Sequence, residues 1–223
     1  MVCIVWRLDR AAVTRGEYMS ESSKTADLKV EIVEREACFR GFYALDRVHL
    51  RHELFAGGMG PLISRELFVR HDAVCVLPYD PLRDAVVLIE QFRVGALDKS
   101  AHPWLLELVA GLIDKDEVPE EVARREAMEE AGLTLGELWP VTAYYPSPGG
   151  SDERVHLYVG RCDSRGAGGI HGLVEEGEDI RVLVLSLDEA LAAMEAGRLD
   201  NAASIIALQW LALHRELVRQ TWQ

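Results

Sequence analysis

Apolar and polar residues alternate through the first part of the chain, as at Val30 and Ile32 and again at Leu67. A period of two indicates β-strands, because successive side chains of a strand point to opposite faces. The turn-rich segment AGGMGP at 56–61 separates the later runs. The pattern therefore predicts an N-terminal antiparallel β-sheet subdomain over residues 29–72.

Two nearly continuous apolar runs follow, at 73–78 and 85–91, and a Pro-Tyr-Asp-Pro turn joins them. Runs of this kind are typical of strands that are buried on both faces. Three further strands are predicted near 139–145, 154–161 and 180–186. Together they predict the sheet of a second and larger domain.

Helix signals are clear at two places in the second domain. Proline suits the first position of a helix, acidic residues suit its first turn, and glycine suits the position after its last turn. A helix is therefore predicted to begin at Pro119, with Glu120 and Glu121 in its first turn, and to end before Gly132. The C-terminal segment, which starts LDEALAAMEAG, predicts two helices broken at Gly197.

These elements predict an α+β fold in which a mixed β-sheet is sandwiched between helices, with the smaller antiparallel sheet at the N-terminal side. The larger domain is placed at 73–223. The segment TRGEYMSESSKTAD at 14–27 is polar, and residues 1–28 are expected to form a disordered N-terminal extension. The Gly-rich, acidic segment 163–179 is expected to be a long mobile loop.

Composition narrows the possible partners. The formal charge is −13, which argues against a nucleic-acid partner because such binding rests on Lys and Arg that neutralise phosphates. No apolar run approaches the ~20 residues of a membrane helix, so no membrane partner is expected. The four cysteines are scattered without a CxxC pair, which predicts free thiols and a cytoplasmic location.

Three glutamates crowd the predicted helix within five positions. At about 100° per residue, Glu126, Glu129 and Glu130 share one wedge of the helix, and like charges at this spacing repel each other. Carboxylates gathered in this way suit Mg²⁺, or Mn²⁺ in its place, which bind oxygen ligands and substrate phosphates. Arg125 stands one turn before Glu129 and can pair with it. The alternative interpretation is a solvated acidic helix face laced with Arg–Glu pairs.

The spacing of charged residues and glycines extends over 23 residues. It resembles the Nudix box, G-x5-E-x7-R-E-U-x-E-E-x-G-U, where U is a bulky aliphatic residue. The matching positions are Gly111, Glu117, Arg125, Glu126, Glu129, Glu130, Gly132 and Leu133. Ala127 departs at the first U position, a small-for-large change that affects packing rather than chemistry.

The resemblance extends beyond the box to the bacterial ADP-ribose pyrophosphatases. Pro148 lies 15 residues past the box, and the segments FRGFYALD, PWLLELVAG and DNAASIIALQWL look like those of this subgroup. The resemblance implies a Nudix fold, a homodimer with exchanged N-terminal strands, and Mg²⁺-dependent cleavage of ADP-ribose to AMP and ribose 5-phosphate by attack of water at phosphorus.

The resemblance also implies roles for individual residues. The implied magnesium ligands are the Ala110 carbonyl and the carboxylates of Glu126, Glu130 and Glu178. The implied catalytic residues are Glu176, as the general base, with Glu178, Glu129 and Arg125. The implied substrate-binding residues are Arg65 and Arg93 for phosphates, Phe42 for adenine, and Ser147 and Glu153 for the ribose end, with Arg65, Phe42 and Glu153 acting across the dimer.

Several alternatives stay open. Arg93 has the position of a simple strand-end charge, Arg65 that of a solvated residue, and Phe42 that of a core residue. Glu178 is the alternative to Glu176 as the base. At the level of function, the rivals are hydrolysis of GDP-mannose or ADP-glucose, a non-catalytic ADP-ribose sensor, and a DNA-binding regulator, for which the chain offers no basic helix-turn-helix.

Overall fold

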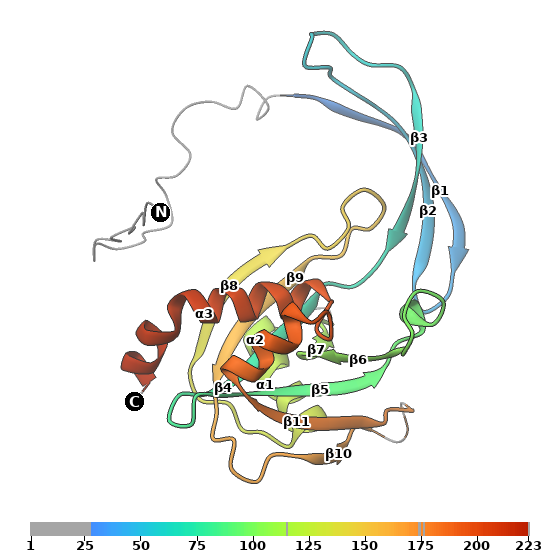
Figure 1. Cartoon of the computed structure of the whole chain (residues 1–223). Coiled ribbons are helices and arrows are strands. Elements are labelled where there is room, and N and C mark those ends of the chain that lie inside the picture. The colour runs from blue at the N-terminus through green and yellow to red at the C-terminus, as the bar shows by residue number, and fades with distance from the viewer. Residues whose placement is uncertain (1–27, 115, 174, 176, 223) are drawn as a thin grey trace. The chain divides into compact units, whose positions relative to one another are not determined.

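The computed structural model describes residues 28–114, 116–173, 175 and 177–222 (Figure 1). Residues 1–27 lie outside this description, and the expected N-terminal extension falls almost entirely within them. None of the helices in the described part of the chain has both the length and the apolar composition needed to cross a bilayer.

Three strands form the N-terminal sheet, in the order β1-β2-β3. They are β1 (Val30–Arg40), β2 (Ala44–His52) and β3 (Ile63–Val69), which confirms the antiparallel sheet that the alternating pattern predicts. Every residue of β1 is exposed, including its apolar side chains. The alternation in this strand therefore does not reflect burial within the described chain.

Eight strands form the larger sheet. The predicted ones are confirmed as β4 (Ala73–Asp80), β5 (Ala85–Phe92), β8 (Leu138–Tyr144), β9 (Val155–Arg161) and β11 (Ile180–Ser186). The apolar runs of β4 and β5 are buried along most of their length, as predicted. Two further strands, β6 (Trp104–Glu107) and β7 (Val109–Leu112), are too short to give a clear sequence pattern.

The eighth strand corrects a prediction. The segment expected to be a long mobile loop contains β10 (Gly169–His171), which pairs with β11 in antiparallel register. Its sequence gives only a weak strand signal, since Ile170 favours strands but the flanking glycines do not. The free edge of β11 supplies its hydrogen-bond partners, so tertiary structure decides this element.

The strands of the larger sheet run in the order β10-β11-β5-β4-β9-β8, with β6 paired to β5 and β7 paired to β4. β4 and β9 are parallel, whereas the other described pairs of this sheet are antiparallel. The sheet is therefore mixed, as predicted.

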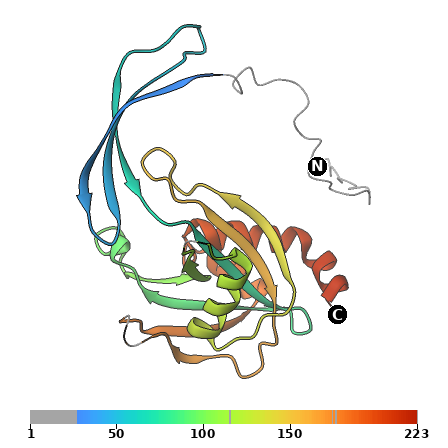
Figure 2. The same cartoon turned by 180° about the vertical axis from the view of Figure 1, so that it is seen from behind.

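Helices cover both faces of this sheet. Figure 1 shows α2 (Leu187–Glu195) and α3 (Ala202–Trp222) in front of it, and Figure 2 shows α1 (Pro119–Ala131) on the opposite face. Each face has its own apolar core, one packed with α2 and α3 and the other with α1. The predicted break at Gly197 is confirmed, because it lies between α2 and α3.

The described chain divides into two compact units. One comprises residues 28–36 and 47–65, and the other comprises residues 37–46 and 66–222. The boundary that the sequence places between residues 72 and 73 stays a prediction. All the residues of the cavity described next belong to the second unit.

Candidate active site

A cavity of about 1220 Å³ opens in the second unit, between α1, β6, β7 and the start of α3. Its walls bring together nine residues that the sequence predicts for the site: Phe42, Arg93, Ala110, Arg125, Glu126, Glu129, Glu130, Glu153 and Glu178. They come from segments that lie far apart along the chain. The fold therefore gathers the expected metal-binding and substrate-binding groups in one place.

Helix α1 presents its acidic wedge to this cavity because its opposite side is apolar. Val122, Ala123, Ala127 and Ala131 are almost completely buried in the core beneath the helix. Gly132 ends the helix in the left-handed conformation, at φ 64°, which glycine adopts without strain. Ala127 fills the position where the box usually has a bulky residue, so the departure falls in the core, as expected.

Gly111 makes room for a carboxylate. A Cβ atom built on this residue would lie 2.0 Å from Oε1 of Glu126 and 2.3 Å from its Cδ. Gly111 lies inside strand β7, so it does not serve a sharp turn. Its function here is close approach, since the Glu126 side chain occupies the space that any other residue would fill.

The two central carboxylates are poorly solvated. Glu130 is 3% exposed, and its Oε2 accepts a hydrogen bond from the Ala110 N–H at 2.9 Å. Burial raises the pKa of Glu130 to about 8, and burial likewise raises the pKa of Glu126 to about 7, from an ordinary value of 4.5. Removal from water penalises the charged form, so both groups would be stabilised by a cation.

Arg125 supplies positive charge to the wedge, as its position predicts. Its Nη1 donates to Oε1 of Glu126 at 2.8 Å and to Oε2 of Glu129 at 3.1 Å. Its Nη2 lies 3.8 Å from the carboxylate of Glu117, another residue of the box. The Arg–Glu pairing of the alternative interpretation therefore exists, but it lies in a cavity with buried carboxylates rather than on an open helix face.

These residues fit a divalent cation. Within the described part of the chain no three His, Cys, Asp or Glu side chains form a ready-made cluster. The fit rests instead on two buried carboxylates, Glu126 and Glu130, whose raised pKa values show that their charge is under-compensated. Hard cations such as Mg²⁺ keep several waters and bind through one or two protein carboxylates, so a pair is sufficient.

Glu178 also lines the cavity and closes the base of a loop. Its Oε2 accepts the Leu173 N–H at 2.9 Å, and its own N–H donates to the Leu173 carbonyl at 3.2 Å. The neighbouring Gly172 leaves no room for a side chain, since its Cβ would lie 2.7 Å from Cβ of Glu178. Glu176, the predicted base, lies outside the described residues.

His171 ties this loop to the end of α1. Its Nε2 lies 3.0 Å from the Gly168 carbonyl, and its ring lies so close to Gly132 that a Cβ there would be 2.8 Å from Cε1. The next residue, Gly172, donates its N–H to the Glu129 carbonyl at 3.4 Å. The sequence gives His171 no assigned role, whereas the structure makes it the contact between the box helix and the loop.

Arg93 lies across the cavity from α1. It follows β5 directly, and its Nε donates to Oε2 of Glu107 at 2.7 Å. Burial lowers the pKa of Arg93, but Glu107 and Glu130 together outweigh it and raise the pKa, so the guanidinium stays charged. The structure thus places Arg93 inside the cavity, and Glu107 is the partner that holds it there.

Arg70 also lines the cavity, and it was not predicted as a site residue from the sequence. Arg70 donates to Oε2 of Glu153 at 3.0 Å and to the Tyr43 hydroxyl at 3.2 Å, and its guanidinium carbon lies 4.7 Å from the centroid of the Tyr43 ring. Its Nε is buried and has no hydrogen-bond partner among the described residues. A short polar segment between two strands gives no signal for such a role.

Phe42 borders the same group. Its side chain is 77% exposed, so it is not a core residue, and its ring meets Tyr43 edge-on with centroids 4.7 Å apart. Two other predicted substrate residues do not line the cavity. Arg65 lies on β3 within the other unit, and Ser147 accepts backbone hydrogen bonds from Gly150 and Ser151 in a turn.

Comparison with known proteins identifies the family of this chain. The NUDIX domain family model matches residues 69–208. The "ADP-ribose pyrophosphatase" of Escherichia coli (strain K12) is 52% identical over 193 residues, which cover 86% of this chain and 92% of that protein. The protein of the same name from Haemophilus influenzae is 43% identical over 208 residues, covering 92% of this chain and 96% of the relative.

More distant relatives share the family. The "GDP-mannose pyrophosphatase" of Pectobacterium atrosepticum is 35% identical over 181 residues, covering 81% of this chain and 92% of the relative. A crystal structure described as an "ADP compounds hydrolase" superposes with a TM-score of 0.64 at 22% identity, over 86% of this chain and 96% of that one, and supports the fold. The site, the fold and the sequence matches agree, and the chain belongs to the NUDIX domain family.

Proposed function

We propose that this enzyme hydrolyses the diphosphate bond of ADP-ribose to give AMP and ribose 5-phosphate. The observation that carries the proposal is the cavity itself, in which buried carboxylates on α1 face arginines and aromatic rings. Carboxylates suit the metal, arginines suit a diphosphate, and rings suit a nucleobase. The two relatives named ADP-ribose pyrophosphatase, at 52% and 43% identity, support this substrate.

Glu126, Glu130 and Glu178, with the Ala110 carbonyl, are proposed to hold Mg²⁺, or Mn²⁺ in its place. When bound, the ions polarise the phosphoryl oxygens, lower the pKa of the attacking water and offset charge that develops on the diphosphate. The under-compensated charge of Glu126 and Glu130 supports their part in this set. Arg125, paired to Glu126 and Glu129, orients the acidic wedge.

Other residues of the chain move the proton and hold the substrate. Glu176 is proposed as the general base that accepts the proton of the attacking water. Arg93 and Arg70 are proposed to bind the diphosphate, since charge-assisted hydrogen bonds from arginine are the strongest that a phosphate can receive. The buried Nε of Arg70 supports this role, because it is a donor without a partner among the residues that the structure describes.

Phe42 and Tyr43 offer ring surfaces for the adenine, and Glu153, beside Arg70, offers an acceptor for ribose hydroxyls. A stacked base fits the high exposure of Phe42. Ser147 keeps its proposed contact at the ribose end, although it lies outside the cavity wall of a single chain.

We also propose a homodimer with exchanged N-terminal strands. Support comes from β1, whose apolar residues Val30, Ile32 and Val33 are each more than half exposed. An exposed apolar edge strand is a liability unless another chain covers it. Arg65 would then reach the site of the neighbouring subunit. We expect neither a nucleic-acid nor a membrane partner, and the acidic charge supports the first of these expectations. The scattered thiols support a cytoplasmic location.

The test is hydrolysis of a panel of nucleotide sugars with Mg²⁺, with products separated by chromatography. AMP and ribose 5-phosphate should form from ADP-ribose well ahead of products from GDP-mannose and ADP-glucose, and EDTA should abolish the reaction. Faster cleavage of GDP-mannose would replace the substrate, in line with the more distant relatives of that name. Binding of ADP-ribose without cleavage would favour a sensor.

A further inference from the structure

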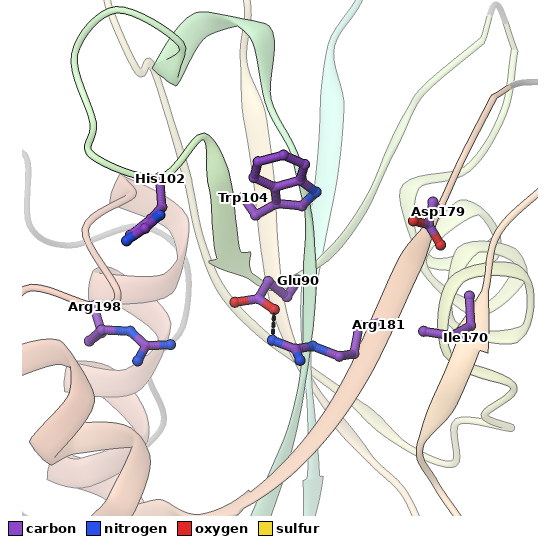
Figure 3. A pocket seen from close by; sticks show the side chains of 7 residues that line it. All are labelled: Glu90, His102, Trp104, Ile170, Asp179, Arg181 and Arg198. Carbon is purple, nitrogen blue, oxygen red and sulfur yellow. Dashed lines mark hydrogen bonds and ion pairs between the residues drawn. The ribbon is translucent and has the colours of Figure 1, made fainter.

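A second cavity of about 680 Å³ lies beside β5, β6, β10 and β11 and the connection between α2 and α3. None of the residues that line it lines the candidate active site. Its volume is within the ~300–1000 Å³ typical of sites for small molecules. Figure 3 shows its side chains, which come from β5, β6, β10, β11 and the connections beside them.

Cationic side chains extend into this cavity from different elements. Arg198, from the connection between α2 and α3, has no hydrogen bond or ion pair of its side chain within the described residues, and the His102 ring likewise has none. Arg181, from β11, forms an ion pair with Glu90 of β5. In Figure 3, Arg198 and His102 lie on one side, and the Arg181 guanidinium points towards the space between them.

An indole ring forms another wall. Trp104 is 55% exposed, although large aromatic residues are mostly buried. Phe92 meets it edge-on with ring centroids 5.6 Å apart, so the ring is supported from one side and open on the other. Ile170, on β10, is 66% exposed and adds apolar surface to the same cavity.

We propose that this cavity is a second binding site, for a nucleoside monophosphate. The phosphate would lie against Arg198 and His102, where charge-assisted hydrogen bonds are available and unused. The base would stack on Trp104, an interaction that every base can make with an aromatic ring. Asp179, which also lines the cavity, is an acceptor for the sugar hydroxyls.

The charge balance of the cavity sets the class of ligand. Glu90 and Asp179 oppose the two guanidinium groups of Arg181 and Arg198. A single phosphate group is matched by the unpaired Arg198, whereas a diphosphate chain would meet the two carboxylates. The second cavity therefore differs from the first, in which carboxylates suit a metal and arginines suit a diphosphate.

The two cavities are lined by neighbouring residues of the same elements. Trp104 lines the second cavity and the next residue, Leu105, lines the first. Asp179 and Glu178, just before β11, are divided in the same way. A ligand held on Trp104 and Asp179 therefore contacts the backbone of the same strand and loop that build the candidate active site.

Calorimetric titration of the whole protein in EDTA tests the proposal, because turnover is then excluded and the result does not depend on the proposed reaction. AMP, adenosine and inorganic phosphate are the probes. AMP should bind more tightly than either fragment. Arg198→Ala and Trp104→Leu should each weaken AMP binding at least ~10-fold. Arg161→Ala, which removes an exposed arginine paired with Glu137, should leave it unchanged.

Opposite outcomes would overturn the site. AMP affinity that survives Arg198→Ala and Trp104→Leu but is lost in Arg93→Ala would place AMP in the candidate active site alone. Phosphate binding equal to AMP binding would remove the role of Trp104. Arg198→Ala changes an exposed side chain, so its result stands even if Trp104→Leu disturbs packing against Phe92. Failure here with intact ADP-ribose hydrolysis would leave the proposed function standing.

Discussion

Oε1 of Glu126 lies 2.0 Å from the point where a Cβ of Gly111 would stand. The glycine of the box and Glu126, the first of its proposed metal ligands, are thus complementary in shape. A strand residue without a side chain lets a helix carboxylate lie against the backbone beside Ala110, the residue whose carbonyl the sequence proposes as a further ligand. The two positions are separated by 15 residues in sequence and meet only through the packing of α1 on β7.

Gly111→Ala should therefore abolish function with little effect on folding. The atoms in conflict belong to the end of a flexible side chain, which can turn away, so we expect a loss of stability below ~2 kcal/mol. The displaced carboxylate should lower kcat/KM by at least ~100-fold. Gly136→Ala is the matched control, since its Cβ would make only ordinary contacts at 3.6 Å. Full activity of Gly111→Ala would show that Glu126 does not act where it lies.

Divalent cations should stabilise the protein through Glu126 and Glu130. Binding to the native state alone raises the free energy of unfolding by RT ln(1 + [L]/Kd), so Tm should rise with the logarithm of the Mg²⁺ concentration once this exceeds Kd. Glu126→Gln and Glu130→Gln should each reduce this shift. Glu121→Gln, an exposed change in the first turn of the same helix, should keep it. Thermal scans with and without EDTA measure the effect, and equal shifts in all variants would place the metal elsewhere.

Substitutions of Glu175, Glu176 and Glu178 should have different kinetic effects. Glu176→Gln should lower kcat by at least ~100-fold, because a general base contributes about this much, while Mg²⁺ affinity is kept. Glu178→Gln should weaken Mg²⁺ binding, as expected for a ligand. Glu175→Gln should behave like the native enzyme. If Glu178→Gln loses turnover with normal metal affinity and Glu176→Gln does not, Glu178 is the base.

His171 should act as a positioning residue for the loop. His171→Ala removes the ring between Gly132 and the loop, so we expect kcat to fall ~10-fold or more with a smaller change in KM. His171→Phe keeps a ring against Gly132 but loses the contact with the Gly168 carbonyl. Partial rescue by Phe would assign the effect to packing. If both variants lost folded protein in the same proportion as kcat, the role of His171 would be structural only.

Asp80 should make the stability of the protein depend on pH. Burial raises the pKa of Asp80, but hydrogen bonds from Ser164 and Arg83 outweigh it and hold the pKa well below its usual range. A lowered native pKa gives stability that is complete above the unfolded value, about 4, and is lost as the pH falls towards the native value. Asp80→Asn should thus cost ~2–4 kcal/mol at pH 7.

The difference between native protein and Asp80→Asn should shrink below about pH 4. Urea unfolding at pH 7 and pH 3 measures it. Asp163→Asn is the control, because Asp163 also contacts Arg83 but is half exposed, and it should change stability little at either pH. A difference that stays constant with pH would mean that the Asp80 carboxylate is not the source of the stability.

Much of this protein follows from local sequence. The limits of α1 are determined by Pro119 and Gly132, residues whose backbone preferences hold in any context. The buried strands β4 and β5 follow from continuous apolar runs, and the break between α2 and α3 follows from Gly197. The acidic wedge is also local, because three glutamates within five helical positions must share a face. For these features the physical cause lies within a few residues.

Other features exist only because distant segments meet. β10 has a glycine-rich sequence and becomes a strand because the edge of β11 offers hydrogen bonds. Arg70 enters the cavity because Tyr43 and Glu153, which are remote in sequence, provide its partners. The raised pKa values of Glu126 and Glu130 come first from burial, which no spacing of residues encodes. The sequence by itself determined that three glutamates share one helix face, and packing decided which other groups meet them and how strongly their charge is felt, since desolvation and contact are properties of the folded chain.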